Sequence, residues 1–409
     1  MIKKFFLVFI IFFLICISFR IVQKQEVNTQ NTIVFWTLQL NTFEEYFRNV
    51  LQEFEKQHPN TRIEWVDIPY SEGEKRVLAT LLSKNVPDLI NITADFARVL
   101  SQKNALELIP KEKTKELNTG VMNSLVNKDA YTSFPFYATS AITIYNKKLV
   151  NKAGLQQLPV TFDELNEVSE SLKKTTGAYA QMPTLCENDT LLKILNKYGI
   201  NTPKTFYSEK TESIYEKYRY LYRNNLIPKE SLTQTHREAL EKYGAEQIVF
   251  LQAGANFLNL IKENSPTVYK NTEVITQLTQ PNAGYDLSLM TLAVPKKSKN
   301  KELAMEFAQF LLNEKNQLEF AKRSIILPVN NKTLNDLAFL NIVEDELQRK
   351  ARRISAQQLS TPVVNMNIQR NKAEITTLVN MTTQSILLDD DSIEPLLKST
   401  AEKWKTLIE

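Results

Sequence analysis

The chain has 409 residues, of which 43% are hydrophobic and 10% aromatic, so one hydrophobic core is not enough and two lobes are expected. Its 50 Lys and Arg residues nearly balance 46 Asp and Glu residues, and a net charge of +4 excludes the basic footprint of a nucleic-acid-binding protein. Only eight glycines occur, without a GxGxxG or GxxxxGK[ST] pattern, which argues against a phosphate-binding loop.

Residues 1–30 read as a signal or anchor segment that does not belong to the fold. Lys3 and Lys4 precede an apolar run at 5–19, which is shorter than the roughly 20 residues of a full membrane span. Cys16 raises the question of lipid attachment, but Ile15 stands where lipoprotein signals place a small residue. We therefore favour an uncleaved anchor over a lipoprotein. Both place the body in the periplasm or elsewhere outside the cytoplasmic membrane.

Cysteine and histidine usage predicts neither a catalytic nor a metal site. Cys186 has no intrachain partner outside the anchor and reads as a small packed residue. His58 stands before a proline at a predicted helix end, and His236 lies in a polar stretch. Since no HExxH, CxxC or GxSxG pattern occurs, we expect no enzyme activity, no cofactor and no metal.

The first third of the chain alternates between strand and helix patterns. Strands are predicted at 31–38, 62–68 and 87–91, where β-branched and aromatic residues concentrate. Helices are predicted at 43–57, 72–85 and 95–103, where apolar residues recur every three or four positions. This alternation predicts an α/β fold with a mostly parallel, doubly wound sheet.

The segment 120–165 indicates a passage between two lobes. An apolar strand through 134–137 continues into a β-rich run at 141–145, a turn, a short helix and a helix start at Thr161. A helix-rich stretch at 162–264 would form most of the second lobe. Predicted strands at 272–280 and 286–294 lead back, followed by a helix at 301–321 and mostly helix from 345 onward.

Several segments along the chain resemble one protein family. They are Trp36-Thr37 on the first strand, FEKQHPNTRIEWVDIPY at 54–70, LLSKNVPDLINI at 81–92, IYNK at 144–147, KAGL at 152–155, LAVPK at 292–296, SKNKELA at 298–304 and LP at 327–328. In this order they resemble the extracellular solute-binding proteins of the maltose/maltodextrin type, the sugar-capturing subunits of bacterial ABC importers. The resemblance covers roughly residues 32–409.

The resemblance implies a two-lobe periplasmic-binding-protein fold of type II, with a mostly parallel sheet flanked by helices in each lobe and a hinge between them. Lobe 1 would comprise 31–137 and 288–328, and lobe 2 would comprise 138–287 and 329–409. Three crossings are expected near 134–140, 286–291 and 326–330. The implied partners are a small solute, expected to be a saccharide, and the permease subunits of an inner-membrane transporter, with the binding protein itself a monomer.

Ligand-binding residues are expected in loops after strands, because ligands of α/β sheets sit at the carboxyl ends of strands. Sugars pack their C–H faces on aromatic rings, and their hydroxyls need charged or amide partners. The candidates are Trp36, Thr37, Gln39, Tyr70, Asn91 and Asp95 in lobe 1, Tyr137 at the crossing, and Asn256, Phe257, Tyr285 and Asp286 farther along the chain.

Each candidate has a structural alternative. Trp36 could pack in a core, as aromatic residues usually do, and Phe257 could do the same. For Tyr70, surface packing is favoured over ligand contact. Asp95 could cap the helix that it begins.

The chain also departs from the family pattern, which leaves other functions open. A single glycine, Gly284, stands where relatives have a pair, and the segment after Pro362 has no aromatic residue. A non-sugar solute such as a polyol phosphate or a peptide is one alternative. An extracytoplasmic glycosidase, which needs two facing carboxylates such as Asp95 and Asp286, is another. A membrane-tethered partner of a sensor is the third.

Overall fold

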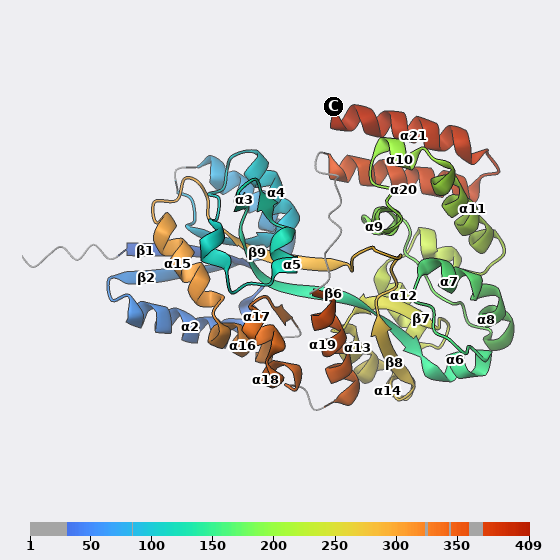
Figure 1. The fold of residues 1–409 in the computed structure, drawn as a ribbon, viewed down its shortest axis with the longest axis horizontal. Coiled ribbons are helices and arrows are strands. Elements are labelled where there is room, and N and C mark those ends of the chain that lie inside the picture. The colour runs from blue at the N-terminus through green and yellow to red at the C-terminus, as the bar shows by residue number, and fades with distance from the viewer. Residues whose placement is uncertain (1–30, 84, 324–325, 343–344, 360–370) are drawn as a thin grey trace, which may run out of the picture.

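The computed structural model describes residues 31–83, 85–323, 326–342, 345–359 and 371–409 (Figure 1). The predicted anchor at 1–30, with Cys16, and the segment after Pro362 lie outside the described residues. Two lobes are joined by long strands, and the α/β two-lobe class predicted from the sequence is confirmed.

Ten strands are present in the described part of the chain. They are β1 (Asn31–Leu38), β2 (Thr61–Ile68), β3 (Leu89–Thr93), β4 (Val126–Asn127), β5 (Ala130–Tyr131), β6 (Phe134–Asn146), β7 (Phe250–Gly254), β8 (Thr272–Thr276), β9 (Leu287–Ala293) and β10 (Leu327–Pro328). Eight of them form one sheet in the order β10-β6-β9-β3-β1-β2, with β7 and β8 also paired to β6.

The helices surround this sheet in both lobes. Those before the second lobe are η1 (Asn41–Phe43), α2 (Glu44–Gln57), α3 (Tyr70–Leu82), α4 (Ala94–Gln102), η2 (Lys111–Thr114) and α5 (Thr119–Asn123). The middle of the chain adds α6 (Lys147–Ala153), α7 (Phe162–Glu167), α8 (Ser169–Thr176), α9 (Thr190–Lys197), α10 (Pro203–Phe206), α11 (Glu209–Arg223), η3 (Lys229–Leu232), α12 (His236–Gly244), α13 (Phe257–Asn264) and α14 (Pro266–Tyr269). The last third adds α15 (Lys301–Leu311), α16 (Glu314–Arg323), α17 (Asn331–Asn335), α18 (Leu337–Leu340), α19 (Glu346–Leu359), α20 (Lys372–Leu388) and α21 (Ile393–Ile408).

Each lobe has its own hydrophobic core. The main core of lobe 1 is rich in phenylalanine, and the rings of Phe35 and Phe307 meet edge to face with their centroids 5.4 Å apart. The main core of lobe 2 is built largely from helices and includes Trp404, whose ring lies 5.6 Å from that of Phe206. Burying an aromatic side chain of this size contributes about 1.5–3 kcal/mol. Each lobe therefore has an apolar interior of its own.

Strand β6 connects the two cores. Its first half contributes Phe134, Phe136 and Ala138 to lobe 1, and its second half contributes Ile142 and Ile144 to lobe 2. It pairs with β9 and β10 in the first half and with β7 and β8 in the second. A single extended strand thus serves as the main link between the lobes.

The sheet is mixed rather than mostly parallel. Only β1–β2 and β1–β3 are parallel, while all pairs made by β6 and the β3–β9 pair are antiparallel. The physical reason is that β6 runs from lobe 1 into lobe 2, whereas β8 and β9 run back toward lobe 1. The prediction of parallel strands therefore holds for β1, β2 and β3 but not for the strands around the crossing.

Two local predictions from the sequence can be compared with the structure, and one is confirmed while the other is wrong. Thr161 starts α7 with a capping box, its hydroxyl accepting from the Glu164 N–H while the Glu164 carboxylate accepts from the Thr161 N–H, as the helix start at this residue predicts. The single helix predicted at 301–321 is instead two helices, α15 and α16. Asn313 separates them, because its side-chain oxygen accepts from the Asn316 N–H at 2.8 Å and begins a new helix.

The last third of the chain returns to lobe 2 later than 329, where the sequence places the boundary. Leu334 and Phe339, on α17 and α18, pack with the core of lobe 1. Helix α19 lies between the lobes, since Ala351 joins a cluster of lobe 2 while Leu359 joins that of lobe 1. We propose that α19 marks the passage back to lobe 2.

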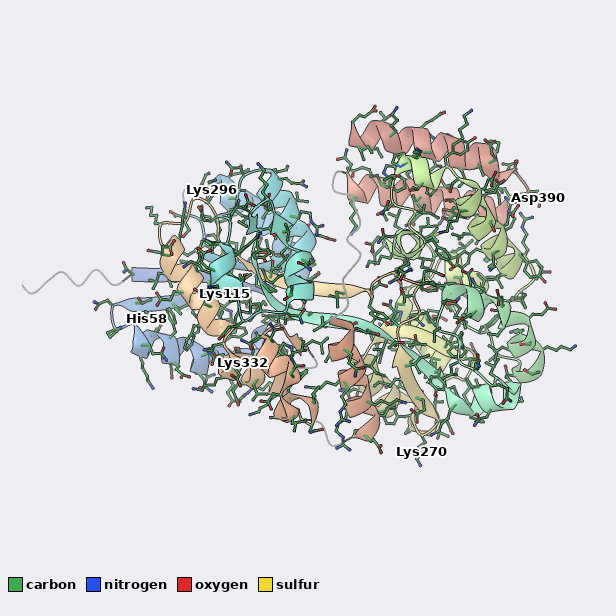
Figure 2. The ribbon with its side chains drawn as sticks, viewed as in Figure 1. His58, Lys115, Lys270, Lys296, Lys332 and Asp390 are labelled. Atoms are coloured by element: carbon green, nitrogen blue, oxygen red, sulfur yellow. The ribbon has the colours of Figure 1, made fainter. Side chains whose placement is uncertain are left out.

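Charged side chains are distributed around both lobes. Figure 2 shows Lys115, Lys296 and Lys332 on lobe 1, and Lys270 and Asp390 on lobe 2. Among the described residues, none of the helices combines the length and the hydrophobicity needed to span a bilayer.

Trp404→Ala tests whether the helical part of lobe 2 depends on this ring. The side chain is 1% exposed, so we expect a loss of about 3–5 kcal/mol in the free energy of unfolding, measured by urea denaturation with circular dichroism. Lys405→Ala on the same helix removes an exposed side chain and should change it by less than about 0.5 kcal/mol. Equal effects of the two substitutions would contradict the packing described.

Candidate functional site

An ionic contact joins the two lobes on the side where α4, α9 and α20 lie. Figure 1 shows α3 and α4 of lobe 1 and α9 and α20 of lobe 2 on the same side of β6 and β9. Lys372, the first residue of α20, places its Nζ 2.9 Å from Asp95 Oδ2 on α4 and 2.9 Å from Asp189 Oδ2 before α9. One ammonium group thus bridges a carboxylate of each lobe.

The charges at this contact shift one another's pKa. Burial acts to raise the pKa of Asp95, but Lys372 and Arg98 outweigh it and hold the pKa below the ordinary value. The same balance, with Lys193 and Lys372 as the cations, lowers the pKa of Asp189. Burial acts to lower the pKa of Lys372, yet the two carboxylates raise it. The bridge is therefore fully charged near neutral pH.

Asp95 is not the cap of α4. The hydroxyl of Thr93 accepts from the Phe96 N–H at 3.2 Å and fills that role, while Asp95 lies within the first turn and pairs with Arg98 at 3.0 Å. The capping alternative for Asp95 is thus wrong, since Thr93 already satisfies the free N–H. The Asp95 side chain remains 59% exposed and faces lobe 2 through Lys372.

At the end of β1, Thr37 belongs to a hydrogen-bond network within lobe 1. Its buried hydroxyl donates to Asp67 Oδ1 at 2.5 Å and accepts from Trp65 Nε1 at 2.8 Å. The Asp67 carboxylate also accepts from the backbone N–H groups of Leu40 and Asn41. This network holds the turn after β1, where Gln39 is exposed with a left-handed φ of 53°.

Three aromatic candidates gather beside this turn. Trp36 and Tyr137 are half-buried and pack on one small cluster of Leu38, Ile68 and Met290. Tyr70 lies in the first turn of α3 and is 53% exposed. Burial raises the pKa of the Tyr137 hydroxyl, and the nearby groups of Tyr70 and Asp67 raise it further. Partly exposed rings from two strands and a helix thus share one surface with a carboxylate.

Asn91 is a buried link between strands. It is 1% exposed, and its side-chain amide donates to the Thr291 carbonyl at 3.1 Å. Its Oδ1 has no hydrogen-bond partner within the described part of the chain. This burial favours a structural role over direct ligand contact for Asn91.

In lobe 2, Asp286 pairs with a buried lysine. Lys197, whose side chain is 3% exposed, places its Nζ 3.0 Å from Asp286 Oδ1 and 3.0 Å from the Gly284 carbonyl. The Gln277 side-chain amide donates to Asp286 Oδ2 and accepts from the Asp286 backbone N–H. The neighbouring Tyr285 is half-buried. A cavity of about 350 Å³ lies beside this pair and is lined by Lys197, Tyr198 and Gln280 among others.

Asp95 and Asp286 each pair with a different lysine. Lys372 pairs with Asp95, and Lys197 pairs with Asp286. The described residues also contain no group of three or more His, Cys, Asp and Glu side chains that could hold a metal ion. Cys186 is half-buried, and burial raises the pKa of its thiol to about 11, consistent with a packed residue.

Asn256 and Phe257 belong to a different place in the fold. Phe257 packs on a core cluster of lobe 2 and meets the His236 ring edge to face, with centroids 4.8 Å apart. Asn256 is exposed and lines a second cavity, together with Thr139 and Ser140 of β6. Figure 1 shows α13, which follows Asn256, on the opposite side of β6 from α4 and α9.

Lys372 and Asp189 were not among the candidates from the sequence. Asp189 before a helical stretch is a recognisable signal for a helix start, but Lys372 has none. Its contact with Asp95 joins residues 277 positions apart, which no local pattern encodes.

Comparison with known proteins places these features in a family. The family model described as bacterial extracellular solute-binding protein matches residues 41–318. A crystal structure from Synechococcus sp. MITs9220, assigned as an oligosaccharide periplasmic-binding protein, has a TM-score of 0.79 at 27% identity, covering 91% of this chain and 98% of the other. The sugar-binding protein MalE of Xanthomonas citri has a TM-score of 0.76 at 18% identity, covering 92% and 97%. In sequence, the diacetylchitobiose binding protein DasA of Streptomyces coelicolor is 24% identical over 318 residues, 73% of each chain.

Lys372→Met tests the bridge between the lobes. Both aspartates have pKa values lowered from the ordinary carboxyl value, so their ionised form stabilises the fold above that value, and this stabilisation is lost as the pH falls through the lowered pKa values. Without the Lys372 ammonium we expect both pKa values to rise, measured by NMR titration of the carboxyl carbons.

The matched control is Lys398→Met, which removes an exposed lysine from α21. It should leave both pKa values unchanged. A Lys372→Met protein in which only the pKa of Asp189 rises would show that the lobes do not meet at this contact in solution.

Proposed function

The chain belongs to the bacterial extracellular solute-binding proteins, and from this premise we propose that it captures a saccharide outside the cytoplasmic membrane for an ABC importer. The observation that carries the proposal is the placement of aromatic and acidic side chains at the strand ends of lobe 1, opposite the helices of lobe 2. Relatives that bind diacetylchitobiose or, in MalE, a sugar support a carbohydrate as the ligand.

The surface formed by Trp36, Tyr70 and Tyr137 suits a sugar ring. Its half-exposed rings can pack on the C–H face of a pyranose, and such contacts favour flat, amphipathic ligands. Asp95 and the exposed amide of Gln39 lie in the same lobe and can accept or donate hydrogen bonds to hydroxyl groups. Thr37 and Asp67 support this surface from below rather than facing the ligand.

Closure of the lobes on the ligand follows if the ligand contacts both lobes. A solute that contacts lobe 1 and lobe 2 together binds the closed arrangement more tightly than the open one and shifts the population toward it. The bridge of Lys372 lies between the lobes, and a ligand that contacts Asp95 would compete with it.

The proposal also concerns the location, the oligomeric state and the partners of the protein. The family places it outside the cytoplasm. We propose that the segment 1–30 tethers it to the cytoplasmic membrane, that it acts as a monomer, and that it delivers its solute to permease subunits of the importer. In this role the protein binds its solute without changing it chemically.

A thermal-shift screen on residues 31–409 tests the ligand class. We expect one or more oligosaccharides to raise the unfolding midpoint, because a ligand that binds only the folded state stabilises it. Polyol phosphates and peptides in the same screen cover the other solutes of this fold. A shift with these and none with saccharides would sink the sugar proposal.

Tyr137→Ala and Trp36→Ala then test the aromatic surface. Loss of a stacking ring should weaken saccharide binding by about 2- to 12-fold in titration calorimetry, since such contacts contribute about 0.5–1.5 kcal/mol each. Tyr220→Ala is the control, because Tyr220 is a tyrosine that is 53% exposed and lies on α11 of lobe 2. Unchanged affinity in both test variants would place the ligand elsewhere.

A further inference from the structure

A second cavity, which the proposed saccharide surface does not use, lies against the crossing strand on the side of α13, α16 and α19. Its volume is about 330 Å³, and its walls come from both lobes, with Leu327 of β10 on one side and Asn259 of α13 on another. Three of its twelve lining residues, Lys322, Arg323 and Arg352, are cations, and none is acidic. Every charged residue in the lining is thus a cation.

Arg352 is the central feature of this cavity. Its side chain is buried, at 6% exposure, and stacks on the Phe339 ring with 4.9 Å between the guanidinium carbon and the ring centroid. It donates a hydrogen bond to the Phe339 carbonyl at 3.4 Å. No carboxylate in the described part of the chain forms an ion pair with it. Burial lowers the pKa of the guanidinium, and no acidic group opposes this effect. A buried cation of this kind is costly unless an anion pairs with it.

A second donor lies on the same face of the helix. Ser355 is three residues after Arg352 on α19, is 2% exposed, and its hydroxyl has no hydrogen-bond partner among the described residues. Gln348, four residues before Arg352, also lines the cavity, and its amide donates to Asn259 Oδ1 at 2.6 Å. One stripe of α19 therefore presents a guanidinium and a free hydroxyl to the same space.

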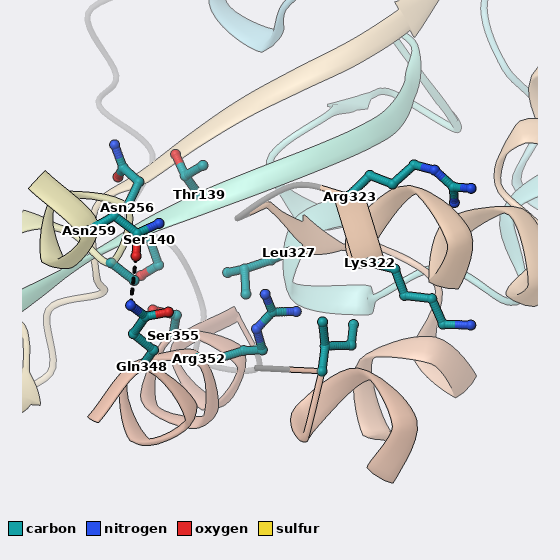
Figure 3. A pocket seen from close by; sticks show the side chains of 12 residues that line it. Thr139, Ser140, Asn256, Asn259, Lys322, Arg323, Leu327, Gln348, Arg352 and Ser355 are labelled. Carbon is teal, nitrogen blue, oxygen red and sulfur yellow. Dashed lines mark hydrogen bonds between the residues drawn. The ribbon is translucent and has the colours of Figure 1, made fainter. Parts of the chain in front are cut away.

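The other two cations already have a carboxylate partner. Lys322 and Arg323 both pair with Glu319 on α16. Figure 3 shows the ends of these two side chains pointing away from the cavity, whereas Arg352 points toward Leu327 inside it. Direct recognition thus falls to α19.

We propose that this cavity binds a small oxyanion, a phosphate, sulfate or carboxylate group, with Arg352 as its charged partner and Ser355 as a second donor. The planar guanidinium offers paired N–H groups that match two oxygens of such a group. The volume exceeds that of an inorganic ion, and Leu327 and Ile342 provide an apolar wall for the carbon part of an organic anion. The site is separate from the aromatic surface, so it does not depend on the saccharide proposal.

Calorimetric titration of residues 31–409 with inorganic phosphate, sulfate and citrate tests the proposal, with sodium chloride at equal ionic strength as the reference for screening. We expect saturable binding of at least one oxyanion and none of chloride. In Arg352→Met, which keeps the apolar stem, the affinity should fall about 10- to 100-fold, because a hydrogen bond to a charged group contributes more than a neutral one. Ser355→Ala should weaken it about 2- to 10-fold.

The control is Arg353→Met, since Arg353 is the exposed neighbour on the same helix and should leave the affinity unchanged. Circular dichroism checks that each variant is folded. If Arg352→Met does not fold, Ser355→Ala still tests the proposal. Absence of saturable binding in the unmodified protein overturns the proposal. Equal affinity in the unmodified protein and in the folded Arg352 or Ser355 variants does the same, because it indicates an adventitious ion only.

Discussion

The structure depends on one strand that belongs to two hydrophobic cores. Strand β6 has a partner on each edge in both lobes, and its apolar residues are buried at both ends. Because both halves are fixed by hydrogen bonds and by burial, the chain between them stays extended, and the lobes are held at a defined separation. The two halves meet near Ser140, where the partners of β6 change from β9 and β10 to β7 and β8.

Charge compensation separates structural ions from functional ones. Lys197 is buried but satisfied by Asp286 and a carbonyl group, so it stabilises the loop before β9. Lys372 is shared between two carboxylates of different lobes, so the energy of its ion pairs depends on the position of one lobe relative to the other. Arg352 is buried and has no carboxylate partner among the described residues, which is why we propose an anion as its partner. The same residue types thus serve three purposes that only their partners distinguish.

Local patterns were sufficient for most of the fold. The strands at 31–38 and 62–68 and the helix starting at Thr161 follow from alternation, periodicity and capping, all of which act between near neighbours. The division of 301–321 into two helices was missed because apolar residues recur at helical spacing on both sides of Asn313, whose side-chain oxygen begins the second helix. The candidate site was predictable in part. Trp36 and Tyr137 pack on one cluster and Tyr70 lies near Tyr137, whereas Asn256 lines the other cavity and Phe257 packs on a core. Which of them contact a ligand stays a prediction.

By itself, the sequence determined the two-lobe α/β class and the order of its elements, since these rest on the apolar pattern along the chain. It also determined the family through segments spread over the whole body. Only the tertiary structure decided the strand directions around β6, the bridge of Lys372 and the burial of Arg352 without a carboxylate partner among the described residues. The physical reason is that an ion pair or a cavity is made by residues that are distant in sequence, and its energy depends on burial and on partners that no local pattern contains.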